Sequence, residues 1–432
     1  MQTPAFFVLD WRAISRMMLY WLYGALDMKS LFAFGFAFAL NLSGSFADEL
    51  RLSGGKNWLA IASTNDKDQA IGIARHLKSD SNGMRVVRSV NGYYAVVAGP
   101  YQAKTMAKFI TSEAGKNFGL LPKDALLSGG ARYVETVWEQ AKDSSVALQS
   151  YTLDKPAVLT SEKLSVRVSG EKLGTENAYT KIEGHDDKGN FTLDIDKDLP
   201  TEQLETQDAM HSEYYHRAGV VKLAAGADTK QVVATQYSGG AHCCTTTYIA
   251  ARGSNAEAWR LIKSEERDGE GFSFEDVDGD GVSELLSIDN AFLYAFESYA
   301  GSNAPIQIFQ LREGKLVDVS TDPAMHTRLV QDLAGMEWDA KVQPEVAKNN
   351  GYLAGWVAAK IRLGQGDEAW RVFMRDYDRK SEVGPQECLT GQKIDECPED
   401  KLKLIPMPRA LAKFLKANGY GPLPKDAEAE LK

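Results

Sequence analysis

Residues 57–137 switch repeatedly between the two spacings that hydrophobic side chains adopt, and this switching constrains the fold more than any other feature of the chain. Trp58–Thr64 is a run of strand-forming residues, and residues 66–77 then carry apolar side chains at helical spacing. Met84–Val90 and Tyr93–Tyr101 are two further strand-like runs. The order strand, helix, strand, strand predicts a small α+β unit with a right-handed crossover.

Local signals mark the ends of these segments. Asn91-Gly92 separates the two later strands, and this dipeptide accepts the positive φ of a tight hairpin turn. A second helix is expected after Pro100, with an apolar face that includes Phe109 and Ile110, and residues 125–137 would supply a last strand. Two helices would then cover one face of the sheet and leave the other face open, where an extended polymer could lie.

The order of these elements, together with the tripeptide Gly99-Pro100-Tyr101, resembles the SPOR domain, a bacterial module that binds the glycan strands of peptidoglycan. The resemblance covers residues 56–137, about a fifth of the chain. It implies a protein of the bacterial cell envelope, in the setting of cell division, that binds a polymer rather than catalyses a reaction. It also implies that peptidoglycan is the partner.

Several positions depart from the usual SPOR pattern. Members of that family typically have glutamine in the first strand, phenylalanine at its end, and arginine in the strand before Gly-Pro. Here these positions are Ala60, Thr64 and Ala95. The glycan contacts would then fall to residues that can stack or donate hydrogen bonds, namely Arg85, Arg88, Tyr93, Tyr94 and Tyr101. The alternative is that the tyrosines complete a hairpin and the unit is an interaction module.

An export signal is predicted near the start of the chain. Met28–Ser30 supplies a short positive region, Leu31–Leu42 an apolar run of 12 residues, and Ser45–Ala47 a small-residue cleavage site. Cleavage after Ala47 would place the protein in the periplasm or outside the cell. Residues 1–27 then represent an upstream start. The alternative joins residues 13–42 into one membrane anchor, so a membrane is a partner only if the leader stays uncleaved.

Charge divides the chain into two parts. Residues 56–137 hold 11 Lys and Arg against 6 Asp and Glu, a net charge of +5. The whole chain carries −10 and residues 1–55 balance to zero, so residues 138–432 carry −15. The asymmetry predicts a domain boundary, with residues 138–156 as a linker. The acidic second part argues against nucleic acid as the main partner.

The remaining chain is too long for one core and is expected to form two regions. Residues 157–322 contain alternating strand-like runs such as Leu164–Ser169 and Gln231–Tyr237, which predict an antiparallel sandwich or a propeller fragment. Residues 323–432 show helical spacing interrupted by glycines. The predicted fold class is therefore α+β and multidomain, with a SPOR-like α/β sandwich, an antiparallel β domain and a helical C-terminal region.

An acidic loop within the β region carries the sharpest chemical signal. Carboxylates stand at positions 1, 3, 5 and 9 of a run that begins at Asp276, and Gly281 permits a sharp turn between them. The run resembles the calcium loops of FG-GAP and dockerin-type repeats. The candidate calcium ligands are the side chains of Asp276, Asp278, Asp280 and Glu284 and the backbone carbonyl of Val282. The alternative is an acidic surface turn that holds no ion.

A second unusual run contains His242, Cys243 and Cys244. Imidazole and sulfur could bind a metal or support a reactive thiolate, which would make the protein an envelope hydrolase or a thiol- or metal-dependent enzyme. Adjacent residues of a strand point to opposite faces, so three contiguous ligands to one ion are geometrically poor. The alternative is a glycine-rich turn fixed by a disulfide. No catalytic residue is assigned.

Four cysteines in an exported protein are consistent with disulfide bonds. Cys388 and Cys397 enclose a short polar loop, and a bond between them would stabilise the fold by about 2–3 kcal/mol on the chain-entropy model. Cys243 and Cys244 would then form the other pair, although sequence alone does not choose among three pairings. Together these features predict a non-enzymatic periplasmic protein that binds peptidoglycan, with a calcium-stabilised β domain that presents a surface to another envelope protein.

Overall fold

The computed structural model describes most of the chain after the predicted leader. The described residues are 50–77, 83–116, 118, 120–140, 146–239, 243–252 and 258–432. The export signal and its cleavage site lie outside them, as does His242. Among the residues that the structure describes, none of the helices is both long enough and apolar enough to cross a membrane.

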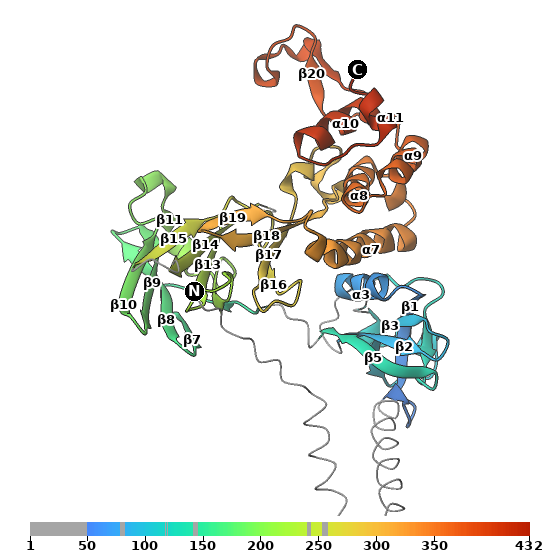
Figure 1. Cartoon of the computed structure of the whole chain (residues 1–432), viewed down its shortest axis with the longest axis horizontal. Coiled ribbons are helices and arrows are strands. Elements are labelled where there is room, and N and C mark those ends of the chain that lie inside the picture. The colour runs from blue at the N-terminus through green and yellow to red at the C-terminus, as the bar shows by residue number, and fades with distance from the viewer. Residues whose placement is uncertain are drawn as a thin grey trace, which may run out of the picture.

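The first unit, residues 57–139, contains one five-stranded antiparallel sheet with the strand order β4-β1-β3-β2-β5 (Figure 1). Its elements are β1 Asn57–Thr64, α3 Lys67–His76, β2 Met84–Ser89, β3 Tyr94–Tyr101, α4 Met106–Ile110, α5 Glu113–Lys116, β4 Leu126–Ser128 and β5 Tyr133–Glu139. The predicted order of elements is therefore present. The expected single last strand is instead two strands, which pair with opposite edges of the sheet.

The two faces of this sheet are buried in different ways. On the α3 face, Leu59, Val86 and Val96 pack with the helix in one apolar cluster. On the other face, Trp58 is 1% exposed and its indole N–H donates to the Leu50 carbonyl at 2.9 Å. Residues just before β1 therefore cover part of the face that the sequence predicted to be open, and only the remainder can receive a ligand.

The β region consists of three antiparallel sheets. The outer sheet contains β7 Ala157–Ser161, β8 Leu164–Leu173, β9 Asn177–Asp186, β10 Gly189–Ile195 and β11 Glu205–Thr206, and the short helix α6 Gln207–Met210 follows it. The middle sheet contains β6 Gln149–Ser150, β12 His216–Val221, β13 Gln231–Tyr237, β14 Thr245–Arg252 and β15 Trp259–Lys263. The inner sheet contains β16 Ser273–Glu275, β17 Glu284–Ile288, β18 Ile306–Arg312 and β19 Lys315–Asp318.

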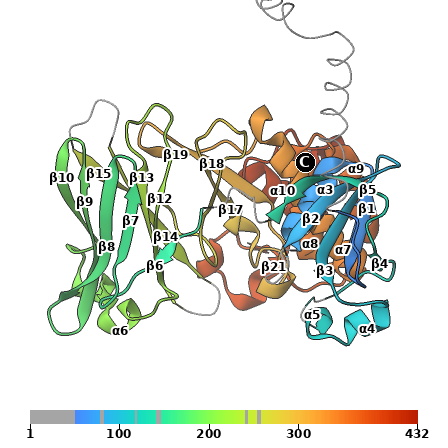
Figure 2. The same ribbon diagram turned by 90° about the horizontal axis from the view of Figure 1, so that it is seen from below.

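These sheets lie in layers, as Figure 2 shows. The middle sheet packs against the outer sheet on one face and against the inner sheet on the other. Side chains of β13 are consequently buried on both faces, which explains the continuous burial from Gln231 to Gln236. The region is a layered sandwich rather than a propeller fragment. The predicted linker is also shorter than residues 138–156, because β6 joins the middle sheet and Tyr151 is fully buried.

The C-terminal region is helical, as predicted. It contains α7 His326–Val342, α8 Asn350–Arg362, α9 Gly366–Asp376, α10 Met407–Ala417, α11 Lys425–Ala429 and a small hairpin of β20 Gln386–Cys388 with β21 Leu402–Leu404. Its core gathers buried side chains that include Leu353, Trp370 and Leu411. Cys388 is joined to Cys397, and this disulfide closes the loop of the hairpin.

The first unit is packed against the rest of the chain rather than held only by a linker. Helix α3 lies along α7, and Trp338 of α7 belongs to the apolar cluster of the first unit (Figure 1). Close approach is possible because Gly72 faces the backbone of Gln331. Glu275 at the end of β16 forms ion pairs with Arg75 of α3 and with Arg328 of α7. Three parts of the chain therefore meet at one junction.

The junction contains His76, and protonation of this side chain should make the stability of the contact between α3 and α7 depend on pH. His76 Nε2 lies 2.7 Å from Asp339 Oδ1, and the hydrogen bond to this carboxylate raises the pKa of His76 above its usual 6.5. Because the pKa of His76 is higher in the folded state than in the unfolded state, protonation stabilises the fold. This stabilisation is fully present below about pH 6.5 and is lost as the pH rises through the folded-state pKa.

We therefore expect the contact between α3 and α7 to weaken as pH rises from about 6 to about 8. Hydrogen exchange of the α3 amides across this range measures the effect. The Asp339→Asn variant should remove most of the pH dependence. His211→Gln serves as the matched control, because His211 lies 3.1 Å from Asp154 in the β region. Equal pH dependence in wild type and Asp339→Asn would contradict the prediction.

Candidate glycan groove and cation loop

A groove of about 490 Å³ lies on the face of the first sheet that α3 leaves uncovered. Ala60 of β1 and Ala95 of β3 are among the residues that line it. The hairpin between β2 and β3 and the segments around β4 form its sides. Polar side chains stand around it, namely Ser63, Ser89, Asn91, Asp124, Ser128 and Arg132. A ligand here would meet small apolar side chains and a polar border.

Two of the departures from the SPOR pattern coincide with this groove. Ala60 and Ala95 occupy positions where that family typically has glutamine and arginine, and here both have short side chains that line the groove. Thr64, the third departure, lies elsewhere, since its hydroxyl donates to Gln69 Oε1 at 3.1 Å beside the start of α3. The substitutions therefore exchange protruding polar side chains for space, and the hydrogen-bonding groups stand at the border instead.

The two predicted arginines lie on opposite faces of β2. Arg85 lies 5.2 Å from the centre of the Trp58 ring and 3.5 Å from Glu139, on the face that carries the groove. Arg88 forms an ion pair with Glu135, and this hydrogen bond raises the pKa of Arg88. Neither arginine lines the groove itself, so the structure does not bring them to one ligand.

The three predicted tyrosines are also separated. Tyr93 is 46% exposed beside the hairpin turn. Tyr94 packs on the α3 face, and Tyr101 is 7% exposed with its ring centre 5.0 Å from that of Phe109. Tyr101 is thus a core residue, and a stacking contact with sugar does not fit its position. Gly99-Pro100-Tyr101 anchors the second helical segment rather than the groove.

The border residues of the groove were not predicted from the sequence. Arg132 and Asp124 lie in loops on either side of β4, and only the sheet order brings these loops beside β1 and β3. A weak signal was present, because Gly129-Gly130 marks a turn two residues before Arg132. Nothing in the local sequence indicates that this turn faces the same groove as Asn91.

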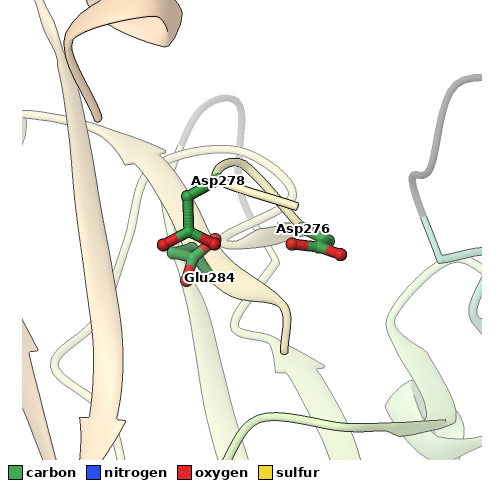
Figure 3. Close-up of side chains that lie close together, drawn as sticks. All are labelled: Asp276, Asp278 and Glu284. Atoms are coloured by element: carbon green, nitrogen blue, oxygen red, sulfur yellow. The ribbon is translucent and has the colours of Figure 1, made fainter. Parts of the chain in front are cut away.

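The acidic loop connects β16 to β17, and three of its predicted ligands converge (Figure 3). Oxygen atoms of Asp276, Asp278 and Glu284 lie within 4.8 Å of one another. Asp280 is not part of this group. Its carboxylate accepts the Val282 N–H at 2.7 Å, and the carboxylates of Asp276 and Asp278 likewise accept backbone N–H groups of the loop. Three of the five predicted ligands therefore lie close together through their carboxylates, and the full set stays a prediction.

Glu284 is the buried member of this group. Its two oxygens accept hydrogen bonds from Gln310 Nε2 and from the Val277 N–H, both at 2.9 Å. Burial raises the pKa of Glu284, and the nearby charges of Asp278 and Asp280 raise it further. Oxygen ligands of this kind suit a hard divalent cation, which would offset the repulsion among the three carboxylates.

The cysteines of the His242 run form a disulfide between neighbours, Cys243 and Cys244. Two hydrogen bonds of 2.8 Å tie Cys244 to Ser238, so the strand ends β13 and β14 remain paired beyond the sheet. Neither sulfur is a thiolate or a metal ligand while it is in this bond. Among the described residues, the group of three or more His, Cys, Asp or Glu side chains that could hold a metal ion is the one in the acidic loop. In the described residues these two cysteines are therefore present as a disulfide rather than as a thiol pair.

Comparison with known proteins places a family match in the helical region. A family model described as the sll0997 C-terminal domain matches residues 329–419, which run from α7 to the end of α10. No solved structure matches the chain. The match covers part of the chain and leaves the first unit and the whole β region outside it.

Two similar proteins extend further along the sequence. "Uncharacterized protein y4bJ" of Sinorhizobium fredii is 34% identical over 398 residues, which is 92% of this chain and 61% of that protein. "Probable thylakoid lumen protein sll0997" of Synechocystis is 36% identical over 190 residues, 44% of this chain and 56% of that protein. The chain therefore spans about three fifths of the length of these relatives.

Proposed function

We propose that this chain is a binding protein of the bacterial cell envelope that holds a glycan strand of peptidoglycan in the groove of its first sheet. The observation that carries the proposal is the groove itself, with Ala60 and Ala95 among its lining residues and a polar border. Such a surface offers contact area to the C–H faces of a sugar and hydrogen bonds to its hydroxyls. The element order and the Gly99-Pro100-Tyr101 tripeptide add the resemblance to SPOR domains.

An exported location is part of the proposal. The Synechocystis relative is named a probable thylakoid lumen protein, and that compartment, like the periplasm, lies across a membrane from the site of synthesis. The predicted signal ending at Ala47 agrees with export. The acidic β region would then present its surface to a second envelope protein, while the first unit holds the polymer.

Filling the groove should abolish binding to the polymer. Ser63 is exposed at the groove, so Ser63→Trp should occupy the space without disturbing the core, and we expect at least about a tenfold loss of affinity for isolated sacculi. Arg132→Ala should cause a smaller loss by removing a donor. Co-sedimentation of the whole exported chain with sacculi measures both.

The matched control is Ser165→Trp, which places the same side chain on an exposed position of β8 in the outer sheet. It should leave binding unchanged. Equal retention of Ser63→Trp and Ser165→Trp would remove the groove from the proposal, and failure of the wild-type chain to bind sacculi would refute the proposed function.

We also propose that Asp276, Asp278 and Glu284 hold a calcium ion that stabilises the β region. Sites of the extracellular type bind at about 10⁻⁴–10⁻³ M. Calcium at about 10 mM would then stabilise the fold by about 1.4–2.7 kcal/mol, because it binds the folded state alone. Thermal melting with calcium or chelator should therefore differ by several degrees.

Variants of two aspartates in the same loop distinguish binding of an ion from a general effect of lost charge on the melting temperature. Asp278 belongs to the converging group, so Asp278→Asn should eliminate the response to calcium. Asp280 lies outside that group and Asp280→Asn should keep most of the response. A melting temperature that changes with neither calcium nor chelator would identify the loop as an acidic turn without an ion.

A further inference from the structure

A second cavity among the described residues lies in the β region, outside the sheet groove of the first unit. It has a volume of about 610 Å³ and opens between the middle sheet and β16 of the inner sheet. Leu148, Phe272 and Phe274 line it and belong to the apolar cluster between those two sheets. Its lining also includes the tyrosines Tyr214, Tyr215, Tyr237 and Tyr299. We call this cavity the tyrosine pocket.

Strand pairing fixes the positions of the tyrosines. The Tyr237 N–H donates to the Tyr215 carbonyl at 2.8 Å, and the two ring centres lie 5.5 Å apart. Tyr237 opens the Tyr-Ser-Gly-Gly run, and Thr245, which follows the paired cysteines, also lines the pocket. Tyr237 and Thr245 therefore form part of one wall. Tyr214, beside Tyr215, is 83% exposed, an unusual position for a large aromatic side chain.

Polar groups of both signs accompany the aromatic rings. Arg217 and Glu270 line the pocket and form an ion pair at 3.0 Å, in which the Arg217 side chain is 36% exposed. Tyr299 donates its hydroxyl to Asp268 at 2.6 Å, and this hydrogen bond raises the pKa of Tyr299 to about 12. Thr235 and Thr245 add hydroxyl groups. Donors and acceptors are thus present, and the charges inside the pocket balance.

We propose that the tyrosine pocket binds a neutral saccharide chain. Tyrosine rings pack against the C–H faces of sugars and keep a hydroxyl available for hydrogen bonds. A guanidinium beside a carboxylate can donate to and accept from neighbouring sugar hydroxyls. The cavity volume falls within the range typical of small-ligand sites.

Other classes of ligand fit the same features less well. An anionic ligand would meet Glu270, and a cationic one would meet Arg217. An extended peptide usually adds itself to a free strand edge. Here β13 is paired on one side with β12 and on the other with β14. The pocket also meets β16, the edge strand of the inner sheet, and this edge is occupied at Phe274, whose carbonyl accepts the Val146 N–H at 3.2 Å. A saccharide requires neither net charge nor an edge.

The test uses two soluble probes, the β-1,4-linked tetramers of N-acetylglucosamine and of glucose, titrated into the whole exported chain by calorimetry. All proteins carry Ser63→Trp, so that any binding measured arises outside the sheet groove. We expect at least one tetramer to bind. Tyr214→Ala should weaken this binding at least about tenfold, the usual effect of losing an aromatic anchor. Because Tyr214 is exposed, thermal melting should stay unchanged.

Leu389→Ala in the same background is the control, since Leu389 is also a large exposed apolar side chain, 61% exposed, but lies in the loop of the C-terminal hairpin. It should leave the affinity unchanged. Absence of binding by both tetramers would overturn the inference, as would binding that is indifferent to Tyr214→Ala. Either result leaves the sheet groove untouched, because sacculus binding is measured separately in the chain that retains Ser63.

Discussion

Replacement of Gly72 by alanine is expected to destabilise the chain by about 1–3 kcal/mol, although alanine is ordinarily favoured over glycine in a helix by about 1 kcal/mol. At this position steric contact reverses the sign of the expected change in stability. A Cβ atom on Gly72 would lie 2.1 Å from the carbonyl oxygen of Gln331, a backbone atom within α7 that cannot turn aside. Helices α3 and α7 would have to move apart, which would disturb the apolar cluster around Trp338.

Gly335 provides a matched control at the same interface. A Cβ atom there would first meet the Cβ of His76 at 3.0 Å, which is a side chain rather than a backbone. Gly335→Ala should therefore cost less than Gly72→Ala and stay within about 1 kcal/mol of wild type. Denaturant unfolding gives the free energies, and hydrogen exchange in α3 and α7 locates the change. Equal losses for the two variants would show that steric contact with the α7 backbone is not the cause.

The Trp370→Ala variant is expected to lose about 3–5 kcal/mol of stability, the usual range for removal of a large buried aromatic side chain. Trp370 of α9 is 1% exposed, and its ring centre lies 4.9 Å from that of Phe373. It shares a core with Leu411 and Leu415 of α10. Truncation would leave a cavity between α8, α9 and α10, so the helical region should unfold at lower denaturant concentration.

Trp356→Ala is the control of the same chemical type. Trp356 of α8 is only half-buried, and its indole N–H donates to Glu337 at 3.0 Å. Its loss should cost about 1–2 kcal/mol, since water can replace the contact. Urea unfolding followed by circular dichroism compares the variants. A loss for Trp370→Ala no larger than that for Trp356→Ala would mean that the core of this region relaxes around the missing ring.

Much of the local structure follows from short-range rules in the sequence. The Asp66 carboxylate accepts the N–H groups of Asp68 and Gln69 and begins α3, as expected from capping. The hairpin of β2 and β3 turns at Asn91-Gly92, where Gly92 has φ of 83°. The acidic loop lies between the strands β16 and β17, within the region that the sequence predicted to be rich in strands. These features depend on contacts between residues that are near in the chain, so they can be predicted from the sequence.

Long-range packing was not accessible in the same way. The expected second helix is only five residues long, with Phe109 buried and Ile110 54% exposed. Of the predicted calcium ligands, the carboxylates of Asp276, Asp278 and Glu284 lie within 4.8 Å of one another, and Asp280 lies outside this group. In both cases the residue types suited the prediction, and the three-dimensional arrangement decided which side chains are buried or lie together.

The sequence by itself determined the strand and helix segments, the hairpin turn, the acidic loop and the division of charge, because each is encoded by neighbouring residues. Only the tertiary structure decided the sheet groove, the tyrosine pocket and the junction of α3 with α7. Each of these joins segments that are far apart in the chain, such as Gly72 with Gln331 or Tyr214 with Phe272. Their contacts depend on the order of strands and the layering of sheets, and periodicity along the chain carries no information about either.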